Sequence, residues 1–143
     1  MKKQFYIGNV PIGDGSVSIQ SMTNVPFTRF DELKAQALAL EKEGCQIIRA
    51  SVPDRLSAER FADLKKAISV PLVADIHFDY RLALASIEAG ADKIRINPGN
   101  IGAEHIKEVA HAAYFGYGFI IQQNEKSIEQ YDKRGKYTHD HID

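Results

Sequence analysis

The sequence predicts an α/β protein of about five βα units that follow a short N-terminal β-hairpin. Apolar or alternating runs of strand length are separated, again and again, by segments whose apolar residues recur at helical spacing. Glycines such as Gly44, Gly90 and Gly116 are placed to end the helical segments before the next strand. Strict alternation with short loops predicts parallel strands joined by right-handed crossovers.

The expected elements begin with the hairpin at residues 4–12, where two short apolar runs flank the turn dipeptide Gly8-Asn9. The parallel strands are expected at 17–22, 45–50, 72–76, 93–96 and 119–122. The helices are expected at 31–43, 57–68, 79–89, 103–115 and 125–134, the last of them weak and polar. Three helices have a candidate cap at their start, namely Thr28 in a capping box, Ser57 and Asp79.

Two architectures are compatible with this pattern, an open doubly wound sheet and a partial (β/α)8 barrel. No Gly-x-Gly-x-x-Gly motif follows the first parallel strand, which weakens the interpretation as a dinucleotide-binding sheet. A complete barrel takes about 250 residues. If the fold is a barrel, roughly three of its eight units are missing from this chain.

Composition limits the classes of partner and cofactor. The 143 residues suggest one domain, and with 44% hydrophobic residues the chain should bury a core. A net charge of −1 argues against nucleic acid as a partner. No apolar run reaches the roughly 18 residues of a membrane span, and the N-terminus lacks an apolar signal segment, so a cytoplasmic protein is expected. The single cysteine, Cys45, cannot supply a multi-cysteine metal site, and no metal site is expected.

The most informative stretch is residues 72–81, where an apolar strand ends in Asp75-Ile76-His77. Residues two apart in a strand point to the same face, so Asp75 and His77 share a face at the C-terminal end of the strand. Parallel α/β proteins bind their ligands at that end. A carboxylate beside an imidazole can orient the ring and favour its charged form. An isolated Asp-x-His is more often a helix cap beside a surface histidine, so the neighbouring strands decide the interpretation.

Arginines stand at equivalent places on those two neighbouring strands. Each of them, Arg49 and Arg95, comes five residues after a glycine that is expected to end a helix. Arg49, His77 and Arg95 should therefore converge above one rim of the sheet, and Asn97 shares the face of Arg95. A single arginine at a strand end more often only reaches solvent. Two in register around Asp-x-His favour an anion site, because the planar guanidinium group suits phosphate oxygens.

Three segments, at residues 20–24, 73–83 and 95–102, which include the strand ends just described, resemble the 4-hydroxy-3-methylbut-2-en-1-yl diphosphate synthase family. The resemblance also covers residues 10–13 and 44–53, is specific from about Ile7 to Gly102, and continues weakly to about Thr138. It implies an iron–sulfur oxidoreductase of non-mevalonate isoprenoid (terpenoid) biosynthesis. Members of that family reductively open 2-C-methyl-D-erythritol 2,4-cyclodiphosphate, with two electrons from an external donor such as ferredoxin or flavodoxin.

The family architecture implies an N-terminal TIM barrel that holds the substrate diphosphate and a C-terminal domain with a [4Fe–4S] cluster. Residues 1–143 then form a truncated barrel domain, without the iron–sulfur domain. By motif position the resemblance implies a substrate-binding barrel mouth formed by Arg49, Asp75, His77, Arg95, Asn97 and Asn124. The fifth strand departs from the family, because Ile120 stands where an arginine would bind the diphosphate and Gln122 replaces a glycine.

Other interpretations remain open at this point. A pterin-binding barrel such as dihydropteroate synthase also places Asp, Asn and Arg at strand ends, and a metal hydrolase could use Asp75 and His77 if further ligands existed. The chain could also be a non-catalytic, decayed fragment. For a fragment of the synthase, we expect the isolated chain to be inactive and to bind no cluster, while part of the diphosphate site remains. Open sheet edges, one of them at 119–121, predict a homo-oligomer.

Overall fold

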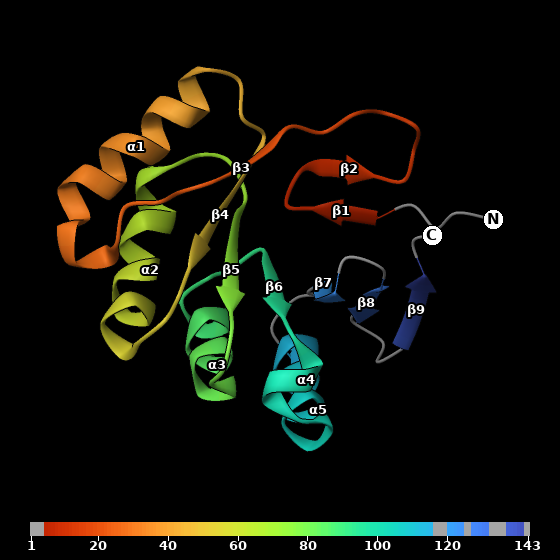
Figure 1. The fold of residues 1–143 in the computed structure, drawn as a ribbon. Helices are drawn as coiled ribbons and strands as arrows, with labels where there is room; N and C mark the ends of the chain where they lie inside the picture. Colours follow the sequence, from red (N-terminus) through yellow and green to blue (C-terminus); the bar gives the residue numbers. More distant parts are fainter. Residues whose placement is uncertain (1–4, 116–119, 125–126, 132–136, 142–143) are drawn as a thin grey trace.

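The computed structural model describes residues 5–115, 120–124, 127–131 and 137–141 (Figure 1). Seven strands form one sheet in the order β3-β4-β5-β6-β7-β8-β9. They are β3 (Gln20–Met22), β4 (Ile47–Ser51), β5 (Leu72–Ile76), β6 (Lys93–Ile96), β7 (Ile120–Asn124), β8 (Ser127–Tyr131) and β9 (Tyr137–His141). The helices are η1 (Phe27–Arg29), α1 (Phe30–Lys42), α2 (Arg55–Ala67), α3 (Tyr80–Glu88), α4 (Pro98–Ile101) and α5 (Ala103–Phe115).

Strands β3 to β7 are parallel and neighbour one another in chain order. Successive parallel strands require a crossover, and α1, α2, α3 and α5 provide it. The strand register sets which residues of β4, β5 and β6 lie at the same level of the sheet. Ser51 lies beside Asp75, and Asp75 lies beside Arg95. The α/β class and the parallel strands predicted from the sequence are therefore confirmed.

The expected helix at 125–134 is wrong for residues 127–131, which form β8 instead. Strand β8 pairs antiparallel with β7, through an irregular step between Gln122 and Asn124, and β9 pairs antiparallel with β8. The segment has few apolar residues to form a helical stripe, whereas the edge of β7 offers backbone hydrogen bonds. Of the expected edge at 119–121, residues 120 and 121 are consequently not at the sheet edge, because β7 lies between β6 and β8, and residue 119 lies outside the described residues.

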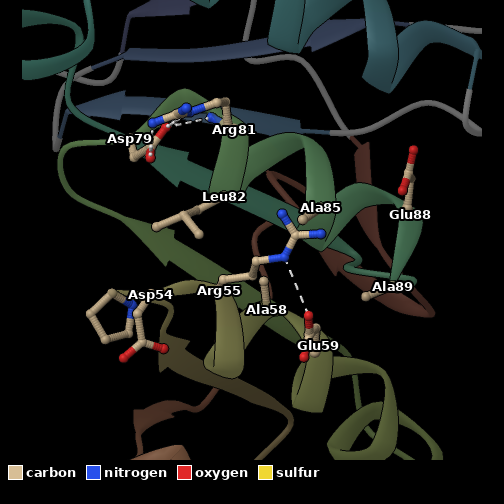
Figure 2. Close-up of a pocket in the computed structure, with 11 residues that line it drawn as sticks. Asp54, Arg55, Ala58, Glu59, Asp79, Arg81, Leu82, Ala85, Glu88 and Ala89 are labelled. Atoms are coloured by element: carbon tan, nitrogen blue, oxygen red, sulfur yellow. Dashed lines mark hydrogen bonds and ion pairs between the residues drawn. The ribbon is translucent and has the colours of Figure 1, made fainter.

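Two of the three helix caps expected from the sequence are not formed in the structure. Asp79 caps α3 as predicted, because its carboxylate accepts from the backbone N–H of Arg81 at 2.9 Å (Figure 2). Helix α2 is capped by Asp54 rather than Ser57, whose N–H and hydroxyl both donate to the Asp54 carboxylate. These hydrogen bonds lower the pKa of Asp54. Helix α1 begins after η1 without a side-chain cap, so the capping box at Thr28 is not formed.

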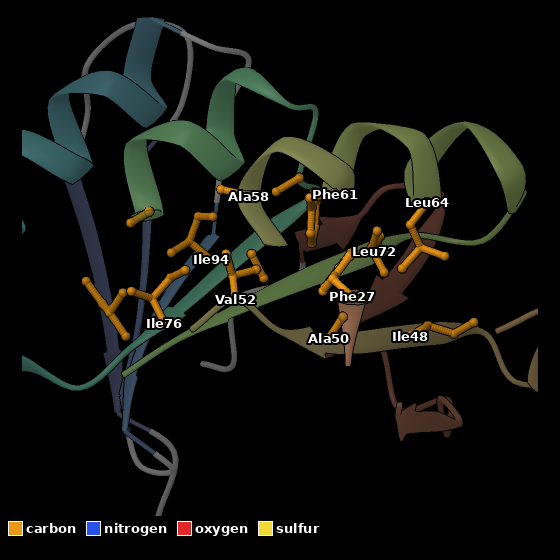
Figure 3. Close-up of a cluster of buried hydrophobic side chains, with 14 of the residues drawn as sticks. Phe27, Ile48, Ala50, Val52, Ala58, Phe61, Leu64, Leu72, Ile76 and Ile94 are labelled. Atoms are coloured by element: carbon orange, nitrogen blue, oxygen red, sulfur yellow. The ribbon is translucent and has the colours of Figure 1, made fainter. Parts of the chain in front are cut away.

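The main hydrophobic core lies between one face of the sheet and the helices (Figure 3). Alternate strand residues point into it, namely Ile48, Ala50, Leu72, Ala74, Ile76, Ile94 and Ile96. The helices contribute residues at helical spacing, including Leu33, Ala37, Phe61, Leu64, Ala83, Ile106, Val109, Ala110 and Ala113. Because strand side chains alternate, the remaining residues of β4, β5 and β6 point to the opposite, inner face of the sheet.

The N-terminal hairpin, β1 (Phe5–Ile7) with β2 (Val10–Ile12), covers the start of that inner face. Ile7 and Val10 pack against Ile47 of β4 and Val73 of β5 in a second buried cluster. At the hairpin turn Gly8 has a φ of +57°, and a Cβ there would meet Cγ of Pro71 at 2.6 Å. The hairpin therefore covers the inner face near the N-terminal ends of β4 and β5 and leaves the side chains at the C-terminal ends of these strands uncovered by it.

Candidate functional site

The predicted site residues Arg49, Asp75 and Arg95 lie on the inner face, towards the C-terminal ends of β4, β5 and β6. Ile47 and Val73 mark this face, because both pack under the hairpin. Arg49 follows Ile47 by two residues and Asp75 follows Val73 by two, so all four share the face. Three adjacent strands thus place charged side chains close together on the inner face, near their C-terminal ends.

The Asp75 carboxylate is the centre of this cluster. Its side chain is only 2% exposed, and Nη1 of Arg95 donates to Oδ1 at 2.9 Å. Its Oδ2 lies 3.8 Å from Nε of Arg49 and 3.5 Å from Nε2 of His77. A buried carboxylate needs cations and donors in place of water. Asp75 therefore holds both guanidinium groups and the imidazole around one point.

Both arginines keep donors that Asp75 does not use. The Arg49 side chain is 26% exposed and that of Arg95 27%, so each is half-buried at the rim. The Nη2 of Arg49 contacts Sδ of Met22 at 3.5 Å, and its buried Nε forms no hydrogen bond with the described residues. A guanidinium group has five N–H donors. An anion at this rim would find several donors oriented by the carboxylate beneath them.

Lys93 is a fourth charged group on the inner face, and the sequence analysis did not select it. It is 5% exposed, begins β6, and lies in register with Val73, two residues before Arg95 on the same face. Burial, followed by repulsion from Arg49 and Arg95, lowers the pKa of Lys93 to about 8, and Asp75 opposes this change. The signal that could have found it is Lys-x-Arg on one face of an otherwise apolar strand.

The two asparagines among the predicted residues are placed differently. Asn97 follows β6, is exposed, and its side-chain oxygen accepts from the N–H of Gly99 at 3.0 Å. This hydrogen bond directs the side chain to the turn that starts α4, and Asn97 makes no contact with Asp75 among the hydrogen bonds of the described residues. Asn124 ends β7, and its side chain lies outside the described part, as do those of Ile120 and Gln122.

A second hollow lies on the opposite side of the sheet, between α2 and α3 (Figure 2). It has a volume of about 670 Å³, and none of the predicted site residues lines it. Its arginines are matched by acids, since Arg55 lies 3.3 Å from Glu59 and Arg81 lies 3.0 Å from Asp79. The hydrogen bonds from Arg81 lower the pKa of Asp79. The lining has four acids, Asp54, Glu59, Asp79 and Glu88, against these two arginines, so this hollow has no excess of positive charge, unlike the inner face.

The residues of this chain do not fit an iron–sulfur cluster. Such a cluster is held mainly by cysteine thiolates, and Cys45 is the one cysteine of the sequence. Its thiol is buried before β4 and donates to the backbone oxygen of Ile47 at 3.0 Å. Among the described residues, no three His, Cys, Asp or Glu side chains gather as metal ligands.

The described helices pack against one face of the parallel sheet (Figure 3) and the charged side chains lie on the other face at the C-terminal strand ends, which is the arrangement of the (β/α)8-barrel class rather than of a doubly wound sheet with helices on both faces. Comparison with protein families gives the same class and a particular family. The GcpE TIM-barrel domain matches residues 2–137. The chain therefore belongs to this family, and the partial barrel predicted from the sequence is confirmed.

Curated relatives carry the name 4-hydroxy-3-methylbut-2-en-1-yl diphosphate synthase (flavodoxin). The protein of Shewanella sp. (strain ANA-3) is 54% identical over 112 residues, which are 77% of this chain and 30% of the relative. The protein of Caldanaerobacter subterraneus subsp. tengcongensis is 53% identical over 133 residues, 91% of this chain and 38% of the relative. The chain thus spans about a third of the length of these relatives, and the predicted resemblance is confirmed.

Solved structures of dihydropteroate synthases share the fold. The enzyme of Stenotrophomonas maltophilia with bound imidazole matches with a TM-score of 0.61 and 20% identity, over 77% of this chain and 44% of its own. The Xanthomonas albilineans enzyme in complex with 7,8-dihydropteroate matches with a TM-score of 0.61 and 18% identity, over 77% of this chain and 48% of its own. At such identities the likeness concerns the fold alone, so it does not favour a pterin-binding function.

Proposed function

We propose that this chain is the diphosphate-binding part of a 4-hydroxy-3-methylbut-2-en-1-yl diphosphate synthase. Its ligand would be 2-C-methyl-D-erythritol 2,4-cyclodiphosphate, held at the C-terminal strand ends. The observation that carries the proposal is the buried carboxylate of Asp75, with two guanidinium groups within 4 Å of its oxygens. Family membership and the names of the relatives support the reaction class.

The charged groups have complementary tasks in this proposal. Arg49 and Arg95 bind phosphoryl oxygens with the donors that Asp75 leaves available, because guanidinium forks match such oxygens closely. Asp75 does not touch the anion, since a carboxylate would repel it, but holds the two forks in position. His77 is 46% exposed and stands at the outer rim, where it can donate to a ligand oxygen. Asn97 and Asn124 are proposed as further contacts at the same rim.

The reductive step requires groups that this chain does not supply. In the proposed full enzyme a [4Fe–4S] cluster would supply the redox chemistry, with flavodoxin or ferredoxin as the proposed electron donor, and the names of the relatives include flavodoxin. Because the chain has one cysteine, we propose that it shows no ring opening by itself. Homo-oligomerisation and a cytoplasmic location are likewise proposed. Within the described residues, no helix is both long and apolar enough to cross a membrane.

Binding of the cyclodiphosphate by the purified 143-residue chain tests the proposal. Isothermal titration calorimetry should detect weak binding to the wild type. The Arg95→Ala and Arg49→Gln variants should bind about ten- to a hundredfold more weakly, because a hydrogen bond to a charged group contributes roughly 1.5–3 kcal/mol. Circular dichroism would show that the variants keep the wild-type fold.

The matched control is Arg55→Ala, which removes an arginine of the outer hollow whose side chain is 91% exposed. Its affinity should equal that of the wild type. If Arg95→Ala and Arg55→Ala bind alike, the inner face is not the diphosphate site. Ring opening by the metal-free chain would disprove the proposal that this chain is inactive alone.

A further inference from the structure

Asp75 holds its two arginines differently. Nη1 of Arg95 donates a hydrogen bond to the carboxylate at 2.9 Å, whereas Nε of Arg49 lies 3.8 Å from Oδ2, which is beyond hydrogen-bond distance. This buried Nε has no hydrogen-bond partner in the described part of the chain. The carboxylate therefore attracts the Arg49 guanidinium group, but attraction without a hydrogen bond leaves the orientation of that group less restricted than the orientation of Arg95.

Met22 contacts the same guanidinium group from the neighbouring strand. It lies directly beside Arg49 in the parallel pairing of β3 with β4, so the two side chains share the inner face. Sδ of Met22 accepts a hydrogen bond from Nη2 of Arg49 at 3.5 Å. A thioether sulfur is a weak, polarizable and uncharged acceptor. Met22 can therefore direct the guanidinium group without repelling an anion, as a second carboxylate in its place would.

The residue after Met22 holds the backbone of Arg49. Thr23 is 6% exposed, its N–H donates to the carbonyl oxygen of Arg49 at 2.9 Å, and its hydroxyl lies 3.4 Å from the same oxygen. Two consecutive residues of the segment at 20–24 thus contact Arg49, one at its backbone and one at its guanidinium group. Met22 is 41% exposed and stands outside both buried clusters, so packing in the core does not explain its position.

We propose that Met22 is a positioning residue of the anion site, whose thioether holds the Arg49 guanidinium group in the orientation that binds a phosphoryl oxygen. This inference rests on the proposed function, because it assumes that Arg49 contacts the diphosphate. Strand β4 lies between β3 and β5, so the sulfur of Met22 and the carboxylate of Asp75 hold the guanidinium group from two sides. The donors that neither atom uses remain for the ligand, and their orientation before binding reduces the entropy lost on binding.

Calorimetric titration with 2-C-methyl-D-erythritol 2,4-cyclodiphosphate tests the inference on two variants of Met22. Met22→Leu has a similar volume but no acceptor, so its affinity should fall about three- to fivefold, the effect of one weak hydrogen bond. Met22→Gln places an amide oxygen within reach of the guanidinium group and should bind like the wild type. Ile19→Leu is the matched control, because it changes another exposed apolar side chain next to β3, and its affinity should equal that of the wild type.

A double-mutant cycle separates positioning of Arg49 from direct contact of Met22 with the ligand. If Met22 acts through Arg49, Met22→Leu should lower the affinity of the wild type and cause no further loss in Arg49→Gln. An equal loss in both backgrounds would mean that Met22 acts without Arg49 and would disprove the inference. The inference is also disproved if Met22→Gln binds as weakly as Met22→Leu, because the acceptor then makes no difference.

Nuclear magnetic relaxation of the ligand-free chain measures the order of each arginine side chain directly. The order parameter of the Arg49 Nε–H bond should fall in Met22→Leu, whereas that of Arg95, which is hydrogen-bonded to Asp75, should not change. Unchanged order at Arg49 would disprove the inference. If Arg49→Gln and Arg95→Ala bind like the wild type, the proposed function fails and the role of Met22 in binding fails with it. If these two variants bind weakly while Met22→Leu binds like the wild type, the anion site stands and the inference alone is wrong.

Discussion

Asp75 is the residue on which the geometry of the inner face depends. A buried carboxylate that loses its cations is strongly destabilising, and so is a buried cation that loses its carboxylate. The hydrogen bond from Arg95 and the approach of Arg49 therefore fix the two guanidinium groups as firmly as they stabilise Asp75. This arrangement prepares donors for a ligand before the ligand arrives, which reduces the entropy lost on binding.

Lys93 makes the free chain less stable at neutral pH than it would be without the charge. Its pKa is lowered from 10.5 to about 8, so the unfolded chain binds more protons between these values. Stability of the wild type should therefore rise as pH rises from about 8 to 10.5, and the full penalty applies below pH 8. Lys93→Met removes the penalty and should stabilise the free chain by up to roughly 3 kcal/mol at pH 7.

Urea unfolding followed by circular dichroism at pH 7 and pH 10 measures this effect. The control is Lys107→Met, on the exposed face of α5, which should change stability by less than about 0.5 kcal/mol. Equal pH dependence of stability in wild type and Lys93→Met would show that the charge of Lys93 is not penalised by burial.

The residues of the site differ in how far the sequence could predict their positions. Asp75, His77, Arg49 and Arg95 could be placed, because the alternation of a strand fixes which residues share a face. Lys93 obeys the same rule, but a lysine in a strand is usually solvent-exposed, so its burial could be seen only in the folded chain. The turn contact of Asn97 depends on local backbone geometry that composition does not determine.

At the scale of secondary structure, side-chain caps determine where the helices begin. Asp54 has an extended backbone and accepts two hydrogen bonds from Ser57, at 2.8 Å from N–H and 2.7 Å from Oγ. Ser57, the cap predicted from the sequence, is also of a residue type that is favoured as a cap, and only the backbone conformation shows that Asp54 takes this place. Helical periodicity alone predicts that a helix exists more reliably than it predicts the residue at which the helix begins.

Removing the Asp54 cap should therefore destabilise the chain. Asp54→Ala is expected to cost about 1 kcal/mol at neutral pH, a typical value for loss of an N-cap. The hydrogen bonds from Ser57 lower the pKa of Asp54 below 3.8, so the contribution is present above that pH and is lost as pH falls through the lowered value. Thr28→Ala is the control, since η1 and α1 have no side-chain cap. If chemical unfolding shows the same loss of unfolding free energy in Asp54→Ala and Thr28→Ala, Asp54 is not the cap.

The segment at 127–131 shows why the last element could not be predicted. Its polar sequence has too few apolar residues to define a period, so local propensity allowed either a helix or a strand. The pairing with β7 supplies backbone hydrogen bonds that only the assembled sheet can offer. Strands β4, β5 and β6 could be predicted because each contains an apolar run that the core requires. The strand expected at 17–22 is shorter in the structure, because only Gln20–Met22 forms β3 and none of these residues belongs to the core.

At the scale of the whole molecule, the sheet has two open edges among the described strands, β3 and β9. A closed barrel has no edges, and an unpaired edge exposes backbone groups that can pair with another chain. Beside β3 the side chains of Val17 and Ile19 are 88% and 56% exposed, and Met22 is 41% exposed. This combination of apolar side chains and an unpaired strand favours association between copies of the 143-residue chain.

The average mass from light scattering should therefore rise with protein concentration. A Val17→Lys/Ile19→Lys double variant should shift the chain towards the monomer, because charged side chains beside an edge strand oppose pairing. The control Leu38→Lys alters an exposed apolar residue on α1 that is 38% exposed and lies away from the edge, and it should associate like the wild type. If the wild type remains monomeric at every concentration while circular dichroism shows an ordered sheet, the open edge does not drive association. If all three proteins associate equally, a surface other than the β3 edge is responsible.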